Sequence, residues 1–331
     1  MSEACVSVLS PAKINLSLRV LGRREDGFHL LDSAVVPVGL CDEICLTRAE
    51  ESAVRVVGEG VDLRALPEDP ERNLAMRAVR RLEREAGRAL PTRVEIRKRI
   101  PLGGGLGGGS SNAAAVLRGM NALWGLELGQ ERLCALGAEL GSDVALFVLD
   151  GLVRMRGRGE WVERAAPGGE AGAGAQAPWV VLANDGTHCA TPEVYRAWDA
   201  WAQAQESPPV RLTSEDGLWN NLRLSFQSGE VSRVARWVGN DLEAPCLGLF
   251  AGVAQTAEAL RAAGCQGVTL CGSGATVFGL VRSREEGEKA LRHPALAGCW
   301  RACVQTLPDG VMAAHGPLTP IVMVRIHVGQ P

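Results

Sequence analysis

Six glycines occupy the positions from 103 to 109 around Leu106, within the stretch PLGGGLGGGSSNAAAVL at residues 101–117. Glycine costs conformational entropy on folding, so a run of this density indicates backbone that approaches another group closely or takes positive φ angles. Backbone N–H groups that no side chain shields bind anions, and phosphate is their natural ligand. The run therefore predicts a phosphate-binding loop.

The segments on either side of the glycines predict which elements hold the loop. Residues 92–100 alternate between apolar and charged side chains, which is typical of a half-buried strand. From residue 116 to 124 apolar side chains recur at helical spacing, and we expect Ser110, Ser111 and Asn112 to cap that helix. A strand, a glycine loop and a helix N-terminus together form an anion-binding arrangement, because the helix dipole adds to the free N–H groups.

Three other interpretations of the glycines compete with this one. Gly103, Gly105 and Gly108 formally satisfy G-x-G-x-x-G, but a dinucleotide-binding fold next requires a strand that ends in an acidic residue, and WGLELGQERLCALGAELG predicts a helix. A Walker A loop requires lysine directly before its Ser or Thr, where this chain has Gly109. A flexible linker is the third possibility, although linkers seldom join a strand directly to a helix.

The N-terminal segment SPAKINLSLRV alternates as well and predicts a strand with Lys13 and Asn15 on its polar face, about 7 Å apart. That face is either solvated or part of a site. Further along, GAELGSDVALFVLDG predicts a helix broken at Gly141, with Ser142 as the cap of a new short helix and Asp143 in its first turn. Asp143 is then either a capping residue or a base at the edge of a pocket.

Two further stretches offer groups that could bind a ligand. Phe28 and His29 follow a turn in RREDGFHLL and place an apolar ring beside a ring that hydrogen-bonds, which suits an aromatic base; ordinary loop packing is the alternative. Residues 272–276 (GSGAT) form a second turn of small residues between two apolar strands. This turn could close over the same phosphates as the first loop.

Composition excludes several classes of protein. The 331 residues carry a net charge of −3 with scattered basic residues, which favours neither nucleic acid nor a membrane surface as a partner. No run of about eighteen apolar residues and no signal sequence is visible, so we expect a cytoplasmic protein. The ten cysteines form no C-x-x-C motif and predict buried thiols rather than disulfides or zinc ligands.

The chain length suits two domains. The Gly/Ala/Pro-rich stretch at residues 165–178 predicts a hinge, which gives an N-terminal domain at 1–165, a C-terminal domain at 178–316 and a tail at 317–331. The sequence leaves the oligomeric state open.

Taken together, the segments PAKINLSLRVLGRREDGFHLLDS, PLGGGLGGGSSNAA, GSDVALFV, TPEVY, NDLEAP and GSGATVF resemble, in this order, the GHMP superfamily of small-molecule kinases. Within it they are similar to members that act on a cytidine diphosphate-linked polyol of the non-mevalonate isoprenoid route. The resemblance implies an α+β fold: an N-terminal domain like domain 2 of ribosomal protein S5, and a ferredoxin-like C-terminal domain. The site would lie between them.

The resemblance also implies roles for individual residues. Lys13 and Asp143 would be the catalytic pair that transfers phosphate from ATP, with Mg²⁺, to a 2-hydroxyl. Substrate contacts would come from Asn15, His29 and two aromatic rings, Phe28 (where the family often has Tyr) and Tyr195 of TPEVY. The ATP loop would consist of Pro101, Leu102, Gly103, Gly104, Gly105, Leu106, Gly107, Gly108, Gly109, Ser110 and Ser111. Another GHMP kinase, for a sugar or homoserine, and a nucleotide-binding protein without catalysis remain as alternatives.

Overall fold

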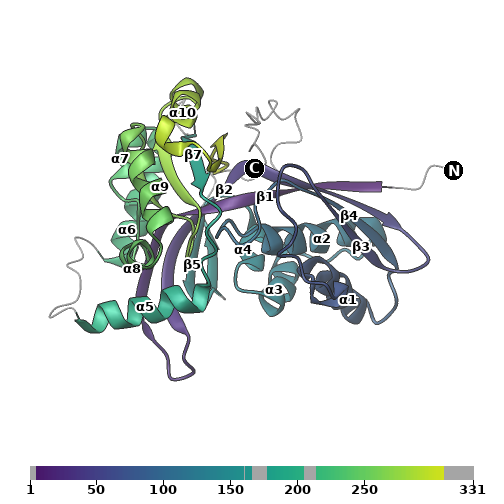
Figure 1. Ribbon diagram of the computed structural model, residues 1–331. Coiled ribbons are helices and arrows are strands. Elements are labelled where there is room, and N and C mark those ends of the chain that lie inside the picture. Colours follow the sequence, from purple (N-terminus) through teal and green to yellow (C-terminus); the bar gives the residue numbers. More distant parts are fainter. Residues whose placement is uncertain (1–4, 160, 166–176, 205–213, 309–331) are drawn as a thin grey trace.

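A long antiparallel ribbon of two strands, β1 (Cys5–Arg23) and β2 (His29–Arg48), runs through the middle of the molecule (Figure 1). The computed structural model describes residues 5–159, 161–165, 177–204 and 214–308. Three register shifts interrupt the ribbon, between Pro11/Ala12, Asn15/Ser17 and Val20/Gly22. Such bulges bend a strand and change the direction of its side chains. Both faces of β1 are buried between residues 10 and 18, so its polar face is not a solvated one.

The ribbon belongs to a seven-stranded sheet in the order β3-β4-β2-β1-β8, with β5 paired to β2 and β6 to β5. Its remaining strands are β3 (Ala53–Gly58), β4 (Thr92–Lys98), β5 (Val153–Gly157), β6 (Trp161–Arg164) and β8 (Gly239–Asn240). In β4 buried and exposed residues alternate strictly, which confirms the strand predicted from the sequence, although it ends two residues earlier.

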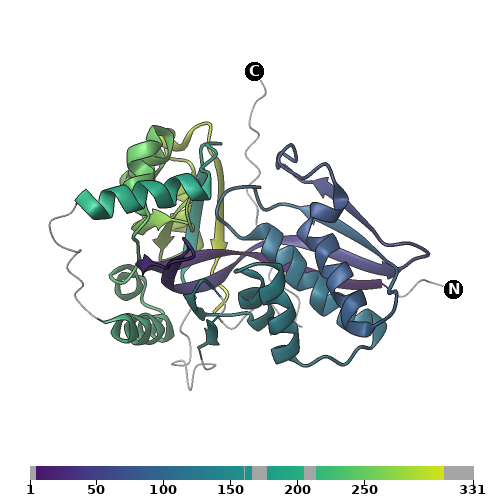
Figure 2. The same ribbon diagram turned by 90° about the horizontal axis from the view of Figure 1, so that it is seen from below.

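Helices pack on one face of this sheet, as the view from below shows (Figure 2). They are the helices α1 (Leu74–Ala86), α2 (Gly108–Trp124), α3 (Gln130–Leu140) and α4 (Val144–Leu149), preceded by the 3₁₀ turn η1 (Pro70–Arg72). The apolar side of α2 packs against β1 and β2 through residues such as Val116 and Leu117. This burial fixes the helix that follows the glycine loop.

A second, four-stranded antiparallel sheet has the order β11-β7-β10-β9. Its strands are β7 (Trp179–Asn184), β9 (Gln266–Leu270), β10 (Val277–Val281) and β11 (Trp300–Gln305). The helices around it are α5 (Thr191–Ala204), α6 (Glu215–Ser228), α7 (Val231–Ala235), α8 (Glu243–Leu249), α9 (Ala251–Ala262) and α10 (Arg284–Leu291), with the 3₁₀ turn η2 (Pro294–Leu296). Phe250 takes an extended conformation and separates α8 from α9.

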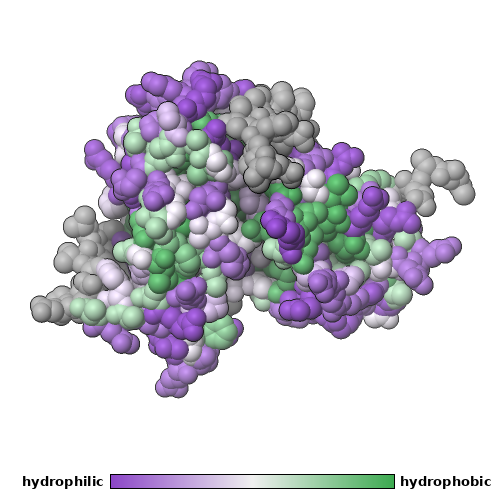
Figure 3. Space-filling view, in the orientation of Figure 1, coloured by the Kyte–Doolittle hydropathy of each residue, from purple (hydrophilic) through white to green (hydrophobic). Residues whose placement is uncertain are grey.

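The two sheets share a hydrophobic core. Ile14 and Leu16 of β1 belong to one buried cluster with Val180 and Leu182 of β7 and Phe278 of β10. Figure 3 shows hydrophilic residues over much of the rim of this face and hydrophobic ones toward its middle. The predicted hinge falls mainly outside the described residues, as does the predicted tail, so the domain boundaries stay predictions. In the described part of the chain no helix is long and apolar enough to cross a membrane.

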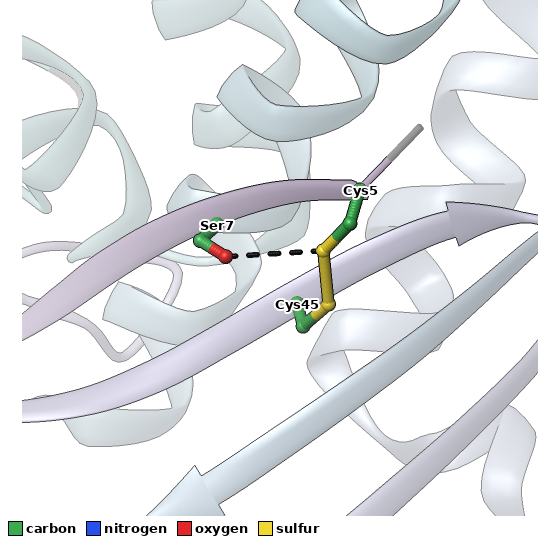
Figure 4. Close-up of a disulfide and its surroundings, with 3 residues drawn as sticks. All are labelled: Cys5, Ser7 and Cys45. Atoms are coloured by element: carbon green, nitrogen blue, oxygen red, sulfur yellow. Dashed lines mark hydrogen bonds between the residues drawn. A yellow bond between two sulfur atoms is a disulfide. The ribbon is translucent and has the colours of Figure 1, made fainter. Parts of the chain in front are cut away.

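One expectation about the cysteines was wrong. Cys5 and Cys45 form a disulfide between β1 and β2 (Figure 4), with their Cα atoms 6.4 Å apart. Cys45 lies opposite Ser7 in the ribbon, which makes Cys5 its diagonal neighbour. Their sequence separation of 40 hides this proximity in the sequence. The other cysteines in the described ranges are free and mostly buried, as predicted.

Candidate active site

A cavity of about 730 Å³ lies where the two sheets meet, and predicted site residues from distant parts of the chain line it. Its lining includes Lys13 and Asn15 from β1, and Asp143 from the start of α4. Phe28, His29 and Tyr195 line it as well. Of the first glycine loop, Gly105 and Gly107 reach the cavity, and Gly272 and Ser273 reach it from the second.

Lys13 points its ammonium group toward a carboxylate. Its Nζ lies 3.8 Å from Oδ2 of Asp143 and donates a hydrogen bond of 2.8 Å to Oδ1 of Asn15. The side chain of Lys13 is 5% exposed and that of Asp143 30%, so the cation is fixed within the protein while the carboxylate faces the cavity. An ammonium at this distance stabilises negative charge on the carboxylate and on an oxygen bound beside it.

Asp143 does not cap its helix. It occupies the N-cap position of α4, where we expected Ser142, but its side chain makes no capping hydrogen bond. A capping carboxylate accepts a hydrogen bond from a backbone N–H two or three residues on. The capping interpretation is therefore wrong for this side chain, and its carboxylate is available to a ligand.

Asn15 connects Lys13 to the second glycine loop. Its Oδ1 accepts hydrogen bonds from Lys13 Nζ and, at 2.9 Å, from the backbone N–H of Gly272, while its Nδ2 donates to Ser33 Oγ at 2.8 Å. Ser33 in turn donates to the backbone oxygen of Ser17. Ser33 gave no signal in the sequence, because only the pairing of β2 with β1 brings it here. Its bond fixes which way the amide of Asn15 faces.

The first glycine loop departs from its predicted form in one respect. Gly107, at φ +71°, is the N-cap of α2, and no side chain caps this helix. The expected caps Ser110, Ser111 and Asn112 all lie inside the helix, where Ser111 and Asn112 are buried and hydrogen-bond to Ser10. The N–H groups at the start of α2 therefore receive no side-chain cap. An anion site requires such uncapped N–H groups.

A buried ion pair lies beside this loop. Lys98, the last residue of β4, places Nζ 2.5 Å from Oδ2 of Asp42, and both side chains are almost completely buried. Asp42 also accepts hydrogen bonds from the N–H groups of Arg99 and Ile100 and from Asn112. Burial lowers the pKa of Lys98, and the negative charge of Asp42 acts in the other direction and raises it. These bonds join the strand before the loop to the helix after it.

The two glycine loops contact each other through their backbones. The N–H of Thr276 donates a hydrogen bond of 3.2 Å to the carbonyl oxygen of Gly104. A Cβ atom on Gly104 would lie 2.6 Å from Thr276 Oγ1, and one on Gly105 would overlap the carbonyl oxygen of Cys271. The close approach of the second loop is thus one reason for glycine at 104 and 105, beside the phosphate binding that the sequence predicts.

At the aromatic end of the cavity, His29 contacts two rings of α5. His29 stacks on Tyr195 with ring centroids 4.7 Å apart and meets the edge of Trp198 at 5.6 Å. Phe28 is 54% exposed, with the guanidinium of Arg158 3.9 Å from its ring centroid. Burial raises the pKa of Tyr195, so the phenol stays neutral. Trp198 and Arg158 gave no signal in the sequence.

Two family models match the chain: "GHMP kinases N terminal domain" over residues 73–151 and "GHMP kinases C terminal" over residues 223–295. A 4-diphosphocytidyl-2-C-methyl-D-erythritol kinase of Citrifermentans bemidjiense is 36% identical over 91% of this chain and 99% of its own length. The chain belongs to the GHMP kinase family. It is accordingly a small-molecule kinase, which confirms the resemblance seen in the sequence and the α+β fold that it implied.

Other relatives of this GHMP kinase carry the same name. The relative from Bacillus velezensis is 37% identical over 82% of this chain and 87% of its own length. The relative from Moorella thermoacetica is 37% identical over 85% of this chain and 90% of its own length. A crystal structure of 4-(cytidine 5'-diphospho)-2C-methyl-D-erythritol kinase superposes with a TM-score of 0.70 at 30% identity, covering 90% of this chain and 99% of that one. A homoserine kinase from Cytophaga hutchinsonii, at 19% identity and a TM-score of 0.67 over 93% and 96% of the two chains, shows the shared fold.

The family models leave part of the site of this GHMP kinase outside their ranges. They include the glycine loop, Asp143 and the second loop, but not Lys13, His29 or Tyr195. The cavity therefore combines the matched segments with residues of β1, β2 and α5.

Proposed function

We propose that this GHMP kinase uses ATP to phosphorylate the 2-hydroxyl of 4-diphosphocytidyl-2-C-methyl-D-erythritol, giving the 2-phosphate and ADP, in non-mevalonate isoprenoid precursor biosynthesis. The observation that carries the proposal is the pair of Lys13 and Asp143, 3.8 Å apart in one cavity with a glycine loop and a cluster of aromatic rings. The names of the relatives support the choice of substrate.

Asp143 is the base in this proposal. Its uncapped, part-exposed carboxylate accepts the proton of the 2-hydroxyl, and the resulting oxygen attacks the γ-phosphorus of ATP as ADP leaves. The Lys13 ammonium stabilises the negative charge that passes from the carboxylate to the attacking oxygen. Asn15 keeps Lys13 in place, because its Oδ1 accepts one hydrogen bond from Lys13 and a second from the backbone N–H of Gly272 in the second loop.

The ATP phosphates occupy the loop from Pro101 to Ser111 in this proposal, because Gly105 and Gly107 line the cavity and no side chain caps the N–H groups that begin α2. In the described residues no cluster of three or more His, Cys, Asp or Glu could hold a metal by itself. Mg²⁺ fits the site as an ion carried by ATP, since it takes phosphate oxygens, water and few protein ligands. When bound it neutralises phosphate charge.

The cytidine base is assigned to the end of the cavity at His29 and Tyr195, with Phe28 at its exposed edge. An ADP-release assay tests the whole proposal with the diphosphocytidyl substrate, galactose, mevalonate and homoserine side by side. Turnover with the diphosphocytidyl compound at least about a hundredfold above the others is expected. Equal or higher turnover with another alcohol would reassign the substrate, and no turnover with any would leave a nucleotide-binding protein.

A further inference from the structure

Three side chains on one face of α5 contact the imidazole of His29. Tyr195, Trp198 and Asp199 lie at positions i, i+3 and i+4 of this helix, so their side chains project in the same direction. Tyr195 stacks on the imidazole, Trp198 meets it edge-on, and Oδ1 of Asp199 lies 2.7 Å from its Nε2. The ring consequently has one orientation, set by a helix from a distant part of the chain.

Asp199 also determines which nitrogen of His29 carries a proton. An ionised carboxylate can only accept hydrogen bonds, so Nε2 must be the donor. The other oxygen of Asp199 lies 3.4 Å from Nη1 of Arg23, whose charge balances the carboxylate. His29 and Asp199 are 9% and 17% exposed, so water competes little for this bond. With the proton of a neutral ring held at Nε2, the Nδ1 atom is a hydrogen-bond acceptor.

The free acceptor faces no partner within the described part of the protein. Nδ1 of His29 makes no hydrogen bond to any described residue, and His29 lines the cavity. A base whose edge carries an amine donates to such an atom, whereas a base with a carbonyl at the same place is repelled by it. Cytosine and uracil differ in this way at C4.

We propose that Asp199 is a positioning residue that fixes the His29 tautomer and thereby makes the cavity select cytosine over uracil. The inference rests on the proposed function, because it assumes that the base lies against His29. It deepens that function by naming the feature of the base that is recognised and the residue that sets the recognition.

The experiment measures CDP and UDP as competitive inhibitors against the diphosphocytidyl substrate. In the unmodified protein CDP is expected to bind at least about tenfold more tightly than UDP. In Asp199→Ala this preference should fall about tenfold, mostly by loss of CDP affinity, while KM for ATP and kcat at saturating substrate stay near their original values. In Asp199→Asn the single amide oxygen is held by Arg23, so the NH2 group faces Nε2, the ring proton moves to Nδ1, and the preference should fall as it does in Asp199→Ala.

Glu193→Gln is the matched control, since Glu193 is an exposed carboxylate on the same helix that does not line the cavity. It should leave both inhibition constants unchanged. The ¹⁵N spectrum of His29 provides a readout that does not depend on any variant: we expect the proton on Nε2 in the unmodified protein. A proton on Nδ1 instead, or on both nitrogens, would overturn the proposal even if Asp199→Ala failed to fold.

The outcomes separate the inference from the proposed function. If the unmodified protein turns over the diphosphocytidyl substrate and prefers CDP, but folded Asp199→Ala keeps the full preference, the inference fails and the function stands. If the unmodified protein neither turns over that substrate nor distinguishes CDP from UDP, the proposed function fails as well.

Discussion

The backbone N–H of Thr276 donates a hydrogen bond to the carbonyl oxygen of Gly104 and thereby joins two glycine-rich turns that are far apart in the chain. Through this contact the second sheet holds the loop that precedes α2. Asn15 ties the same second turn to Lys13. The geometry of the loop and of the lysine therefore depends on the same packing between the two sheets.

Substitution of Gly105 should weaken both the fold and ATP binding. Gly105 has φ +76°, and a Cβ there would overlap the carbonyl oxygen of Cys271, so Gly105→Ala strains the backbone and separates the loops. We expect a loss of about 2 kcal/mol or more in the free energy of unfolding and a higher KM for ATP. Thermal unfolding and initial rates measure the two effects. Gly248→Ala in α8 is the control, because Gly248 lies outside the loop and a Cβ there would have no atom within 4 Å. A Gly105→Ala protein as stable as the original would contradict the loop contact.

Asp143→Asn should lower kcat by at least about a hundredfold with little change in either KM, because the amide keeps the shape but cannot take a proton. The thermal midpoint should stay the same, since the side chain caps nothing. Ser283→Ala makes the opposite change: Ser283 caps α10 through the N–H of Glu286, and its loss should cost about 1 kcal/mol of stability without affecting kcat.

Lys13→Met should also lower kcat, and its combination with Asp143→Asn should cost less than the sum of the two, because the ammonium acts on charge that develops through the carboxylate. The four kcat values of the double-mutant cycle measure this coupling. Strict additivity would show that the two residues act independently.

His29→Ala and Tyr195→Ala should raise KM for the cytidyl substrate far more than KM for ATP. Stacking on an aromatic ring contributes about 1–3 kcal/mol per base, and loss of a buried hydrogen-bond partner costs a similar amount. Because the two rings stack on each other, the double variant should lose less than the sum. Phe28→Ala, at the exposed edge, should have the smaller effect. If the ATP KM rises instead, the two ends of the cavity have been assigned in reverse.

Stability should fall as the pH rises above about 9. Burial raises the pKa of Cys41, Cys265, Cys271 and Cys303 from 9.0 to about 12. Between these values the unfolded chain has lost the protons that the folded chain keeps, so the free energy of unfolding decreases through this window. Lys98 acts in the opposite sense. Burial lowers its pKa below 10.5, so the folded chain gives up this proton at a lower pH than the unfolded chain. It is one group against four thiols.

Urea unfolding at pH 8, 9 and 10 in oxygen-free buffer measures this slope. Cys265→Ala removes one of the four thiols and should make the slope shallower. A free energy of unfolding that is constant from pH 8 to 10 would contradict the assignment of these cysteines as buried thiols.

The sequence by itself determined the local elements and the identity of the reactive groups. The alternation in β4, the glycines before α2 and the order of six short motifs were enough to indicate a GHMP kinase, because periodicity and turn chemistry are local properties of the chain. Phe250 shows the limit of such local patterns, since nothing near it in the sequence signalled that it would divide α8 from α9.

Only the tertiary structure decided what each group contacts. Whether Asp143 caps a helix or faces Lys13 depends on where β1 lies relative to α4, and the need for glycine at 104 depends on a turn far along the chain. The partners of His29 on α5 and the disulfide between Cys5 and Cys45 likewise join residues that are remote in sequence. Side-chain contacts across such separations follow from the packing of whole sheets and helices, which no local pattern encodes.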